Sequence, residues 1–326
     1  MNKYTSYHQI TKRVSASLLK LFEDHPSIFK KAYDGELEMV ESPKMKEGTM
    51  KHKYILEPYD FYNCYEVCDY ETPGSKNQKE FIEYYERESK MFDDAGKDTV
   101  LIEAYRRSYK NAVKDDDLVL VQAKKLLEKL KPYLTMLEIL DDGKIPISYA
   151  DLECLKKTKE AISKHKKANA LLLDEDNPEI IKQSEHVILW EAFKVDGKSQ
   201  IDRLLIDKQN KKIIIVDFKT TKSLSEFRDV AEHFKYKRQI AVYRTAVEYE
   251  LRKEYGHEIA DEYEFEHYIV AIDSDYNVEV FSIISGDIES ALDEVEDLLK
   301  KIKYHLDMDD FSQKTYYYTG DGTTVL

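Results

Sequence analysis

The stretch IIIVDFKTT, Ile213 to Thr221, places an aspartate and a lysine at the end of an apolar run. The apolar run predicts a buried strand. Because side chains alternate along a strand, Asp217 and Lys219 are expected on one face and Phe218 on the other. The strand thus presents a carboxylate and an ammonium side by side.

Two further β-like runs precede this strand, and the turn sequences DGK and DKQNKK separate the three runs. This spacing is typical of an antiparallel meander. The second run, SQIDRLLID, carries Asp202, and antiparallel pairing brings the end that holds Asp202 close to the end that holds Asp217. Arg203 follows Asp202 directly and is expected to face away from it, so we interpret Arg203 as structural.

Two interpretations of the Asp217–Lys219 pair stay open on these residues alone. Ion pairs often mark the point where a strand emerges into solvent, and such a pair needs no function. Alternatively, carboxylates on adjacent strands bind divalent cations, and a nearby lysine polarises a water or steadies a phosphate charge. The second interpretation predicts phosphodiester hydrolysis.

The composition describes a globular protein without a general affinity for nucleic acid. The 326 residues are 42% hydrophobic, enough for one large domain or two ordinary ones. The formal charge of -14 requires any nucleic-acid surface to be local, because phosphate binding depends on clustered Lys and Arg. The few cysteines, the lack of an apolar run after Met1 and the lack of ~20 consecutive apolar residues predict a soluble, cytoplasmic protein.

The first half of the chain is predicted to be mostly helical, with a charged insert. Ser15 is expected to cap one early helix, and Ser42 and Pro43 to begin another that places His52 on its apolar side. We treat residues 1–326 as a single domain with five segments. They are N-terminal helices (1–58), a charged helical insert (59–116), a helical segment (117–175), a strand-rich core (176–310) and a C-terminal tail (311–326).

Asp202, followed by the apolar strand that ends in Asp217-Phe218-Lys219, resembles the signature of the PD-(D/E)xK nuclease superfamily. More specifically, the chain is similar over most of its length to the exonuclease VIII-like branch, which includes RecBCD-type and phage recombination exonucleases. The resemblance implies an α/β (α+β) fold. It would have a restriction-endonuclease-like core, with a central mixed sheet flanked by helices, and a helical N-terminal half.

Three further motifs extend the resemblance. Gly48-Thr49-Met50-Lys51-His52 is similar to an early G-T-x-x-H pattern, which implies that His52 is a metal ligand. Glu185 begins an E-x-x-x-x-W strand and is implied as a further acidic ligand. Gln239 and Tyr243 match a helical Q-x-x-x-Y pattern and share a helix face. The implied catalytic set is Asp202, Asp217, Lys219, Glu185, Gln239 and Tyr243, and the implied metal ligands are His52, Asp202, Asp217 and Glu185.

Each of the residues from these motifs also has an ordinary structural interpretation. His52 on an apolar helix face could be a core histidine, and Glu185 could be an exposed charge at the start of a strand. Gln239 and Tyr243 could be ordinary helix residues. A glutamine among packing positions nevertheless needs a hydrogen-bond partner, such as a site carboxylate or a phosphate.

A locally basic segment follows the strand that ends at Lys219. A solvated helix face would account for its later lysines and arginines. The basic residues directly before Gln239 are better placed for contacts to a DNA backbone. Two threonines past Lys219 add hydroxyls for a phosphate, although hydroxyls are common at any strand exit. The candidate DNA contacts are Lys235, Lys237, Arg238, Thr220 and Thr221.

The resemblance implies a metal-dependent deoxyribonuclease. Its cofactor would be Mg²⁺, or Mn²⁺, and Lys219 would help to activate the attacking water. The family further implies 5′-to-3′ degradation of double-stranded DNA ends in phage-type recombination, in the host cytoplasm if phage-encoded, by a ring-shaped homo-oligomer. A single-strand annealing protein is a candidate partner. Some relatives bind an iron–sulfur cluster, but Cys64, Cys68 and Cys154 are too few and wrongly placed, so no cluster is expected.

Three other functions stay open. A structure- or sequence-selective DNA endonuclease would use the same residues, and cleavage of circular DNA would identify it. A catalytically silent DNA- or protein-binding module of the same fold is the second, and the complete set of Asp202, Asp217 and Lys219 argues against it. The third is an acidic interaction protein, with the insert and DIESALDEVEDLL (287–299) as candidate surfaces for a recombination partner.

Overall fold

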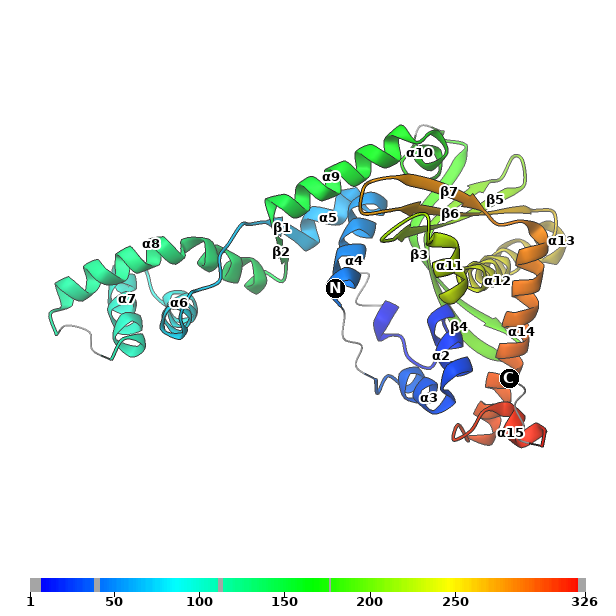
Figure 1. Cartoon of the computed structure of the whole chain (residues 1–326), viewed down its shortest axis with the longest axis horizontal. Coiled ribbons are helices and arrows are strands. Elements are labelled where there is room, and N and C mark those ends of the chain that lie inside the picture. The colour runs from blue at the N-terminus through cyan, green and yellow to red at the C-terminus, as the bar shows by residue number, and fades with distance from the viewer. Residues whose placement is uncertain (1–6, 38–41, 111–113, 176, 322–326) are drawn as a thin grey trace. The chain divides into compact units, whose positions relative to one another are not determined.

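Figure 1 shows the computed structural model of the chain, which describes residues 7–37, 42–110, 114–175 and 177–321. Small parts of the predicted N-terminal helices, insert, core and tail lie outside the described residues; they are 1–6, 38–41, 111–113, 176 and 322–326. The chain forms two compact units, Met1–Glu57 with Thr158–Leu326, and Pro58–Lys157. We name them the sheet unit and the helical unit, and each is described by itself.

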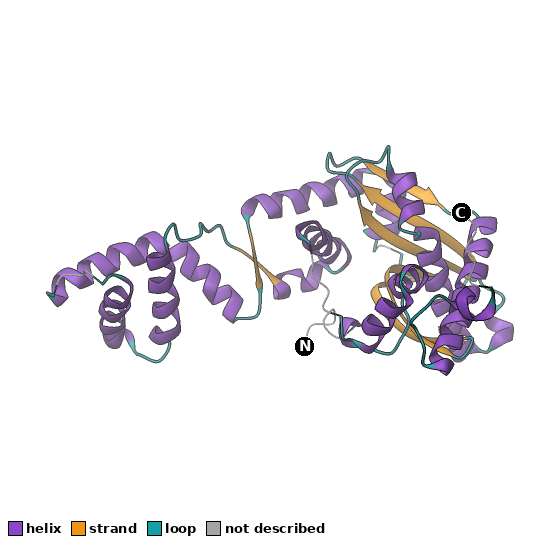
Figure 2. Ribbon diagram, turned by 60° about the horizontal axis from the view of Figure 1, so that its bottom comes forward, coloured by secondary structure: helices purple, strands orange, loops and turns teal. Residues whose placement is uncertain are grey.

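A five-stranded mixed sheet organises the sheet unit (Figure 2). The first three strands pair antiparallel, so the predicted meander is confirmed. The third and fourth strands pair in parallel, which requires a crossover, and the helices between them supply it. The last two pair antiparallel. In spatial order the strands are β3 (Ile180–Ala192), β4 (Val195–Asp207), β5 (Lys212–Thr220), β6 (Glu264–Ile272) and β7 (Val278–Ser282).

Helices cover both faces of the sheet, which confirms the predicted α/β class with a central mixed sheet flanked by helices. One face buries Ile213 and Ile215 of β5, and the opposite face buries Val216 and Phe218. Asp217, the next odd-numbered residue, therefore projects toward the first face. The helices on the first face are α2 (Ala16–Asp24), α3 (Pro26–Asp34), α12 (Tyr236–Tyr255) and α14 (Ser285–Met308); those on the other are α4 (Pro43–Leu56), α10 (Lys166–Leu172) and the end of α9 (Tyr149–Lys164).

Capping residues set the bounds of the helices that carry the site. The Ser42 hydroxyl accepts the N–H of Met45 and begins α4 ahead of Pro43, as predicted. α12 ends at Gly256, whose φ of 81° is a conformation that glycine adopts without strain. The short helices of the sheet unit are α11 (Phe227–His233), α13 (His257–Ala260) and α15 (Thr315–Thr319).

The strand alternation changes phase within the β3–β4 hairpin. On β3, Ile188 and Trp190 face α12, whereas Ile180, which is also even-numbered, packs on the opposite face. On β4, the odd-numbered Ile201 and the even-numbered Leu204 both belong to the core beneath α12. A constant alternation cannot produce this pattern, because residues separated by an odd number of positions point to opposite faces.

Glu185 and Asp202 lie at the point where the phase changes. They are opposite one another in the register, between the pairs Ser184–Arg203 and His186–Ile201. Glu185 has a φ of 50°, a left-handed conformation that is uncommon for glutamate. The change in phase places Ile201 and Leu204 in the same core beneath α12, and it occurs at two of the predicted site residues.

The β3–β4 hairpin also holds the single tryptophan of the chain. Trp190 is 1% exposed, and its Nε1–H donates to the Ser199 hydroxyl at 2.9 Å. Gly197 pairs with Trp190 across the ladder, and a Cβ at residue 197 would lie 2.2 Å from the indole ring. The indole therefore occupies the space that a side chain at residue 197 would need.

The helical unit, Pro58–Lys157, has its own core, built by three helices. The predicted boundary between residues 116 and 117 does not separate packing units, because the helix after it shares this core with the helices of the insert. That helix also continues through Pro132, although a proline inside a helix removes a backbone hydrogen bond and usually kinks or ends it. The elements are α5 (Pro58–Cys64), α6 (Lys76–Ser89), α7 (Asp94–Ser108), α8 (Asp116–Asp141) and the parallel pair β1 (Tyr65–Val67) and β2 (Ile145–Ile147). Of the described helices, none has the length and apolar character needed to cross a bilayer.

Candidate metal centre

The two central strands separate at the predicted site. The pairing of β4 with β5 ends at Arg203 and Val216, directly before the position at which Asp202 and Asp217 would pair. The Asp202 carboxylate fills the gap, since its Oδ2 accepts the N–H of Phe218 at 2.7 Å. The backbone of β5 thus fixes the Asp202 carboxylate where the strands part.

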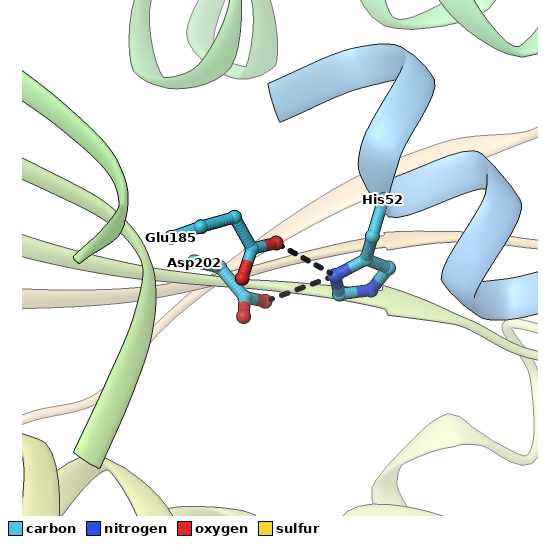
Figure 3. Close-up of side chains that lie close together, drawn as sticks. All are labelled: His52, Glu185 and Asp202. Atoms are coloured by element: carbon cyan, nitrogen blue, oxygen red, sulfur yellow. Dashed lines mark ion pairs between the residues drawn. The ribbon is translucent and has the colours of Figure 1, made fainter. Parts of the chain in front are cut away.

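His52, Glu185 and Asp202 come together from α4, β3 and β4 (Figure 3). Nδ1 of His52 is 3.7 Å from Oδ2 of Asp202 and 3.9 Å from Oε1 of Glu185. Both distances are longer than a hydrogen bond, but they are short enough for an ion pair when His52 is protonated (dashed lines in Figure 3). The His52 ring packs on the Phe218 ring, with 5.0 Å between their centroids, and Gln200 donates to the other Glu185 oxygen at 2.7 Å.

Asp217 and Lys219 form the second half of the site. Both side chains lie on the same side of β5, and Nζ of Lys219 donates to Oδ1 of Asp217 at 2.8 Å. The Asp217 side chain is fully buried, and that of Lys219 is 17% exposed. Nζ of Lys219 also lies 5.0 Å from the centre of the Tyr236 ring. The ammonium is therefore held between a carboxylate and an aromatic face.

Burial makes the carboxylates of the site costly to ionise. Burial raises the pKa of Asp217 to about 6, with Lys219 opposing this shift and Asp202 adding to it. Burial also raises the pKa of Asp202. Burial alone would lower the pKa of His52 and of Lys219, but the surrounding carboxylates outweigh it, and both pKa values lie above their ordinary ones. Negative charge in a poorly solvated space is the condition that a bound cation relieves.

The unpartnered oxygens of the site suit a hard divalent cation. Oε1 of Glu185 and Oδ2 of Asp217 are buried and have no hydrogen-bond partner, although buried carboxylate oxygens normally have one. With Nδ1 of His52 and the Asp202 carboxylate they offer the oxygen-rich, thiol-free donors that Mg²⁺ and Mn²⁺ prefer. Within the described residues, the ligand atoms of His52, Glu185 and Asp202 all lie within 4.8 Å of one another, and Asp217 stands outside this trio. The residues that fit an ion are thus a close trio and one carboxylate on the neighbouring strand.

Gln239 and Tyr243 of α12 lie beside the site and bond to each other. Nε2 of Gln239 donates to the Tyr243 hydroxyl at 2.6 Å. Burial raises the pKa of Tyr243 well above its ordinary value, and the charges of Asp202 and Asp217 add to the shift. The partner of Gln239 is therefore the tyrosine, and not one of the site carboxylates considered from the sequence.

Lys235 and Lys237, two of the predicted DNA contacts, lie at the start of α12. Lys235 is exposed and adopts a left-handed conformation with a φ of 59°. The Lys237 side chain is 43% exposed and pairs with Glu232 at 2.9 Å and with Asp287 at 3.3 Å. Lys235 is thus the more available cation of the two.

Arg238 has a different environment from the one predicted. Its side chain is only 2% exposed, and its Nη1 lies 2.9 Å from carboxylate oxygens of both Glu23 and Glu294. The guanidinium joins α2, α12 and α14 from within the core. Because a buried guanidinium cannot reach a DNA backbone, we withdraw Arg238 from the candidate DNA contacts and assign it a structural role.

Thr220 and Thr221 are half-buried at the end of β5. The Thr221 hydroxyl donates to the carbonyl of Ser223 at 3.3 Å, which is the ordinary strand-exit arrangement. A Cβ at Gly48 would lie 3.6 Å from Oγ1 of Thr220, so the G-T-x-x-H helix approaches this strand end closely at its glycine.

Gln200 and Tyr236 shape the site, although sequence reasoning did not select them. Gln200 orients Glu185, and Tyr236 lies under the Lys219 ammonium. Tyr236 precedes Gln239 by three residues, so helical spacing was a signal that could have found it. Gln200 contacts Glu185 at a residue with a left-handed backbone, and no local sequence pattern predicts that conformation.

The five-stranded mixed sheet flanked by helices is consistent with a restriction-endonuclease-like fold. A model of the PD-(D/E)XK nuclease superfamily matches residues 13–312, so the chain belongs to that superfamily. Among curated proteins none matches the chain. Among solved structures, the chain is similar to one described as a "Putative exonuclease" from Eubacterium rectale, with a TM-score of 0.49 and 13% sequence identity, over 99% of this chain and 92% of that one.

Proposed function

We propose that the protein is a metal-dependent DNA exonuclease that hydrolyses phosphodiester bonds from the ends of double-stranded DNA, 5′ to 3′. Membership in the PD-(D/E)XK nuclease superfamily supports nuclease activity. The observation that carries the proposal is the pair of buried, unpartnered carboxylate oxygens on Glu185 and Asp217, close to His52 and Lys219. Buried carboxylate oxygens usually have a hydrogen-bond partner, so two unpartnered oxygens at one site favour a bound cation over a purely structural ion pair.

Four residues would hold the cation, and hydrogen bonds within the chain orient two of their carboxylates before the cation binds. A divalent cation bound there supplies Lewis acidity toward the phosphate and lowers the pKa of a water. The N–H of Phe218 positions one carboxylate and Gln200 positions another, so little reorganisation is needed on binding. The proposed ligands are His52, Glu185, Asp202 and Asp217.

Lys219 would act as a positive charge and a hydrogen-bond donor. Its pKa lies above the ordinary lysine value, since the carboxylates outweigh the effect of burial, so the amine stays protonated at neutral pH. A protonated amine cannot take a proton from water. It would instead orient the attacking water or stabilise charge on the phosphate oxygens. Asp217 and the Tyr236 ring hold the ammonium in place for this task.

The test is digestion of end-labelled linear duplex DNA beside covalently closed circular DNA, with Mg²⁺, Mn²⁺ or EDTA. We expect loss of linear DNA alone, dependent on the metal, and absent in Asp217→Asn and Lys219→Ala. Lys222→Ala, an exposed lysine past the strand, is the matched control and should retain activity. Labels at the 5′ or the 3′ end report the direction.

Other outcomes would select the alternatives. Cleavage of closed circles would select the endonuclease. Absence of any cleavage by the pure wild-type protein would overturn the nuclease proposal and favour a silent binding module. Retained activity in Lys219→Ala with lost activity in Lys222→Ala would place the chemistry elsewhere.

Double-stranded DNA is the proposed substrate, bound with help from Lys235, Lys237, Thr220 and Thr221. The ring-shaped oligomer and the annealing-protein partner are further proposals that rest on the resemblance alone. A ring that turns its basic faces inward would reconcile the formal charge of -14 with DNA binding. Sedimentation equilibrium of the pure protein, and pull-down of an annealing protein by the full chain, are the measurements for them.

A further inference from the structure

A cavity of about 310 Å³ lies beside the metal centre. The N-terminal turn of α2, strand β4 and the start of α12 enclose it. Its walls include Tyr236, which underlies Lys219, and the bonded pair Gln239 and Tyr243. The volume is at the lower end of the range for pockets that hold small ligands, so it suits one nucleotide unit and not a base pair.

The walls of this cavity carry positive charge. Lys20, Lys198 and Lys235 line it, and among the residues that the structure describes no aspartate or glutamate does so. Lys20 donates to the backbone carbonyl of His233 at 3.0 Å, and Lys198 donates to two backbone carbonyls of the N-terminal segment, at 2.6 and 3.0 Å. An ammonium has three donors, so Lys20 retains two for further acceptors and Lys198 retains one, beside the Tyr7 ring whose centre lies 4.6 Å from its Nζ. In a chain with a formal charge of -14, a cavity lined in this way is suited to an anion.

Phe234 presents an aromatic face at the same cavity. It is 52% exposed, and Nζ of Lys20 lies 4.8 Å from the centre of its ring. The Tyr236 ring stacks at 6.0 Å and the His233 ring packs edge-on at 4.8 Å. In the sequence, Lys235 lies between Phe234 and Tyr236, and its backbone is left-handed. Such backbone strain persists only where the surrounding structure fixes the conformation. An exposed ring held beside ammonium groups is the arrangement on which nucleobases stack.

We propose that this cavity holds one unpaired nucleotide of the DNA, with its base against Phe234 and its phosphate beside Lys20 and Lys198. The inference rests on the proposed nuclease function, because the cavity shares Tyr236 and Tyr243 with the metal centre. Every base offers an aromatic face, so the subsite selects unpaired nucleotides without selecting a sequence. A DNA end is thus recognised through a nucleotide that has left the duplex.

The experiment measures binding without cleavage, in EDTA at low salt. The probes are duplexes that carry 2-aminopurine, a fluorescent base quenched by stacking, as one unpaired nucleotide at the 5′ end, as one at the 3′ end, or paired in a blunt end. We expect the wild type to quench the unpaired base at one of the two ends and to bind that duplex more tightly than the blunt one. Phe234→Ala should lose the quenching and bind about 10-fold more weakly, and Phe234→Tyr should retain both properties.

Phe193 provides the matched control within the same unit. It is also an exposed phenylalanine, 43% exposed, with Nζ of Lys300 lying 5.4 Å from its ring, but it does not line this cavity. Phe193→Ala should leave binding and quenching unchanged. Equal binding by Phe234→Ala and the wild type, or an equal loss in Phe193→Ala, would overturn the proposal.

The two proposals fail in distinguishable ways. If the wild type cleaves DNA with Mg²⁺ and Phe234→Ala binds like the wild type, the nuclease stands and the subsite is wrong. If the wild type quenches the unpaired base but never cleaves, the subsite stands and the nuclease proposal fails.

Discussion

Asp217 places a carboxylate where folding disfavours its charge. The side chain is fully buried, and burial raises its pKa from 3.8 to about 6. For an acid with a raised pKa, the protonated form favours the folded state. The contribution of Asp217 to stability is therefore present below pH 3.8 and is lost as the pH rises through 6.

Asp217→Asn should therefore stabilise the metal-free protein while removing its activity. At pH 8 in EDTA we expect the free energy of unfolding to rise by about 1–3 kcal/mol, with no gain near pH 3.8. The Mg²⁺-dependent digestion rate should fall about 100-fold or more. Urea unfolding at the two pH values, with digestion assays beside it, measures both effects. A variant that is less stable than the wild type at pH 8 would contradict the assignment.

His267 of β6 is a second buried titratable group, away from the proposed ligands. Burial, with Arg244 nearby, lowers its pKa from 6.5 to about 4, while Glu266 opposes the shift, and its Nε2 has no hydrogen-bond partner. Between pH 6.5 and about pH 4, His267 is mostly protonated in the unfolded chain and mostly neutral in the folded chain. Stability is therefore lost as the pH falls through this window.

His267→Leu removes that titration, so the unfolding free energy of the variant should fall less steeply at acid pH than that of the wild type. Relative to this variant, the wild type should lose about 2–3 kcal/mol of unfolding free energy between pH 7 and pH 4. Urea unfolding of both proteins across the range makes the comparison, so that carboxylates common to both cancel. Parallel stability curves would show that His267 titrates normally in the folded protein.

The β3–β4 hairpin depends on a close approach that only glycine permits. Gly197→Ala would place a methyl group 2.2 Å from the Trp190 ring, which the packed core can accept only by moving the indole. We expect a loss of about 2–3 kcal/mol in unfolding free energy. Gly286→Ala, at the start of α14 with nothing within 4 Å, is the control and should be neutral or slightly stabilising. Equal stability of the two variants would contradict this account of the hairpin.

Arg238 links three helices, and its charge should matter more than its bulk. Replacing Glu23 and Glu294 by glutamine leaves the guanidinium buried without a counter-charge, which we expect to cost about 3–5 kcal/mol. Arg238→Met removes the charge itself and should cost less. Thermal unfolding of the double glutamine variant and of Arg238→Met tests whether the glutamine variant loses more stability. DNA affinity of Arg238→Met at a temperature where it is folded should equal that of the wild type, since Arg238 does not reach solvent.

Local patterns predicted the elements of the sheet better than the detail of the site. The turn sequences and the apolar run before Asp217 are local signals, and they specified the meander and the face shared by Asp217 and Lys219. The phase change at Glu185 has no such signal, because a constant alternation is the default for any strand. The hydrogen bond that Glu185 accepts there comes from Gln200, 15 residues away, so no local pattern contains it.

Arg238 shows why charge along the sequence is a weak guide to a DNA surface. Its neighbours Lys235 and Lys237 suggested a basic face, but its partners Glu23 and Glu294 are 215 and 56 residues away in the chain. The same helical turn thus holds an exposed lysine and a buried arginine. Only the packing of α2 and α14 distinguishes them.

At the scale of the whole molecule, the two units have separate hydrophobic cores. The helical-unit core is built around residues such as Phe81, and the sheet-unit core beneath α12 includes Phe29. Both phenylalanines are fully buried. Each core can therefore be weakened without changing the packing of the other.

We expect two unfolding transitions, each sensitive to its own core. Phe81→Ala should lower the stability of the helical unit by about 3–5 kcal/mol and leave the other transition in place, and Phe29→Ala should do the reverse. Scanning calorimetry of the full chain with each substitution resolves the two. A single transition that shifts equally in both variants would show that the units unfold as one.

The position of Trp190 supplies an optical means to tell these transitions apart. It is the only tryptophan in the chain, and it lies 1% exposed in the sheet unit, with its indole bonded to Ser199. Its emission should shift to longer wavelength when that unit opens and stay unchanged when the helical unit melts. Far-ultraviolet circular dichroism reports the helices and strands of both units. A difference between the fluorescence and the dichroism curves would therefore show which unit unfolds first, without any added dye.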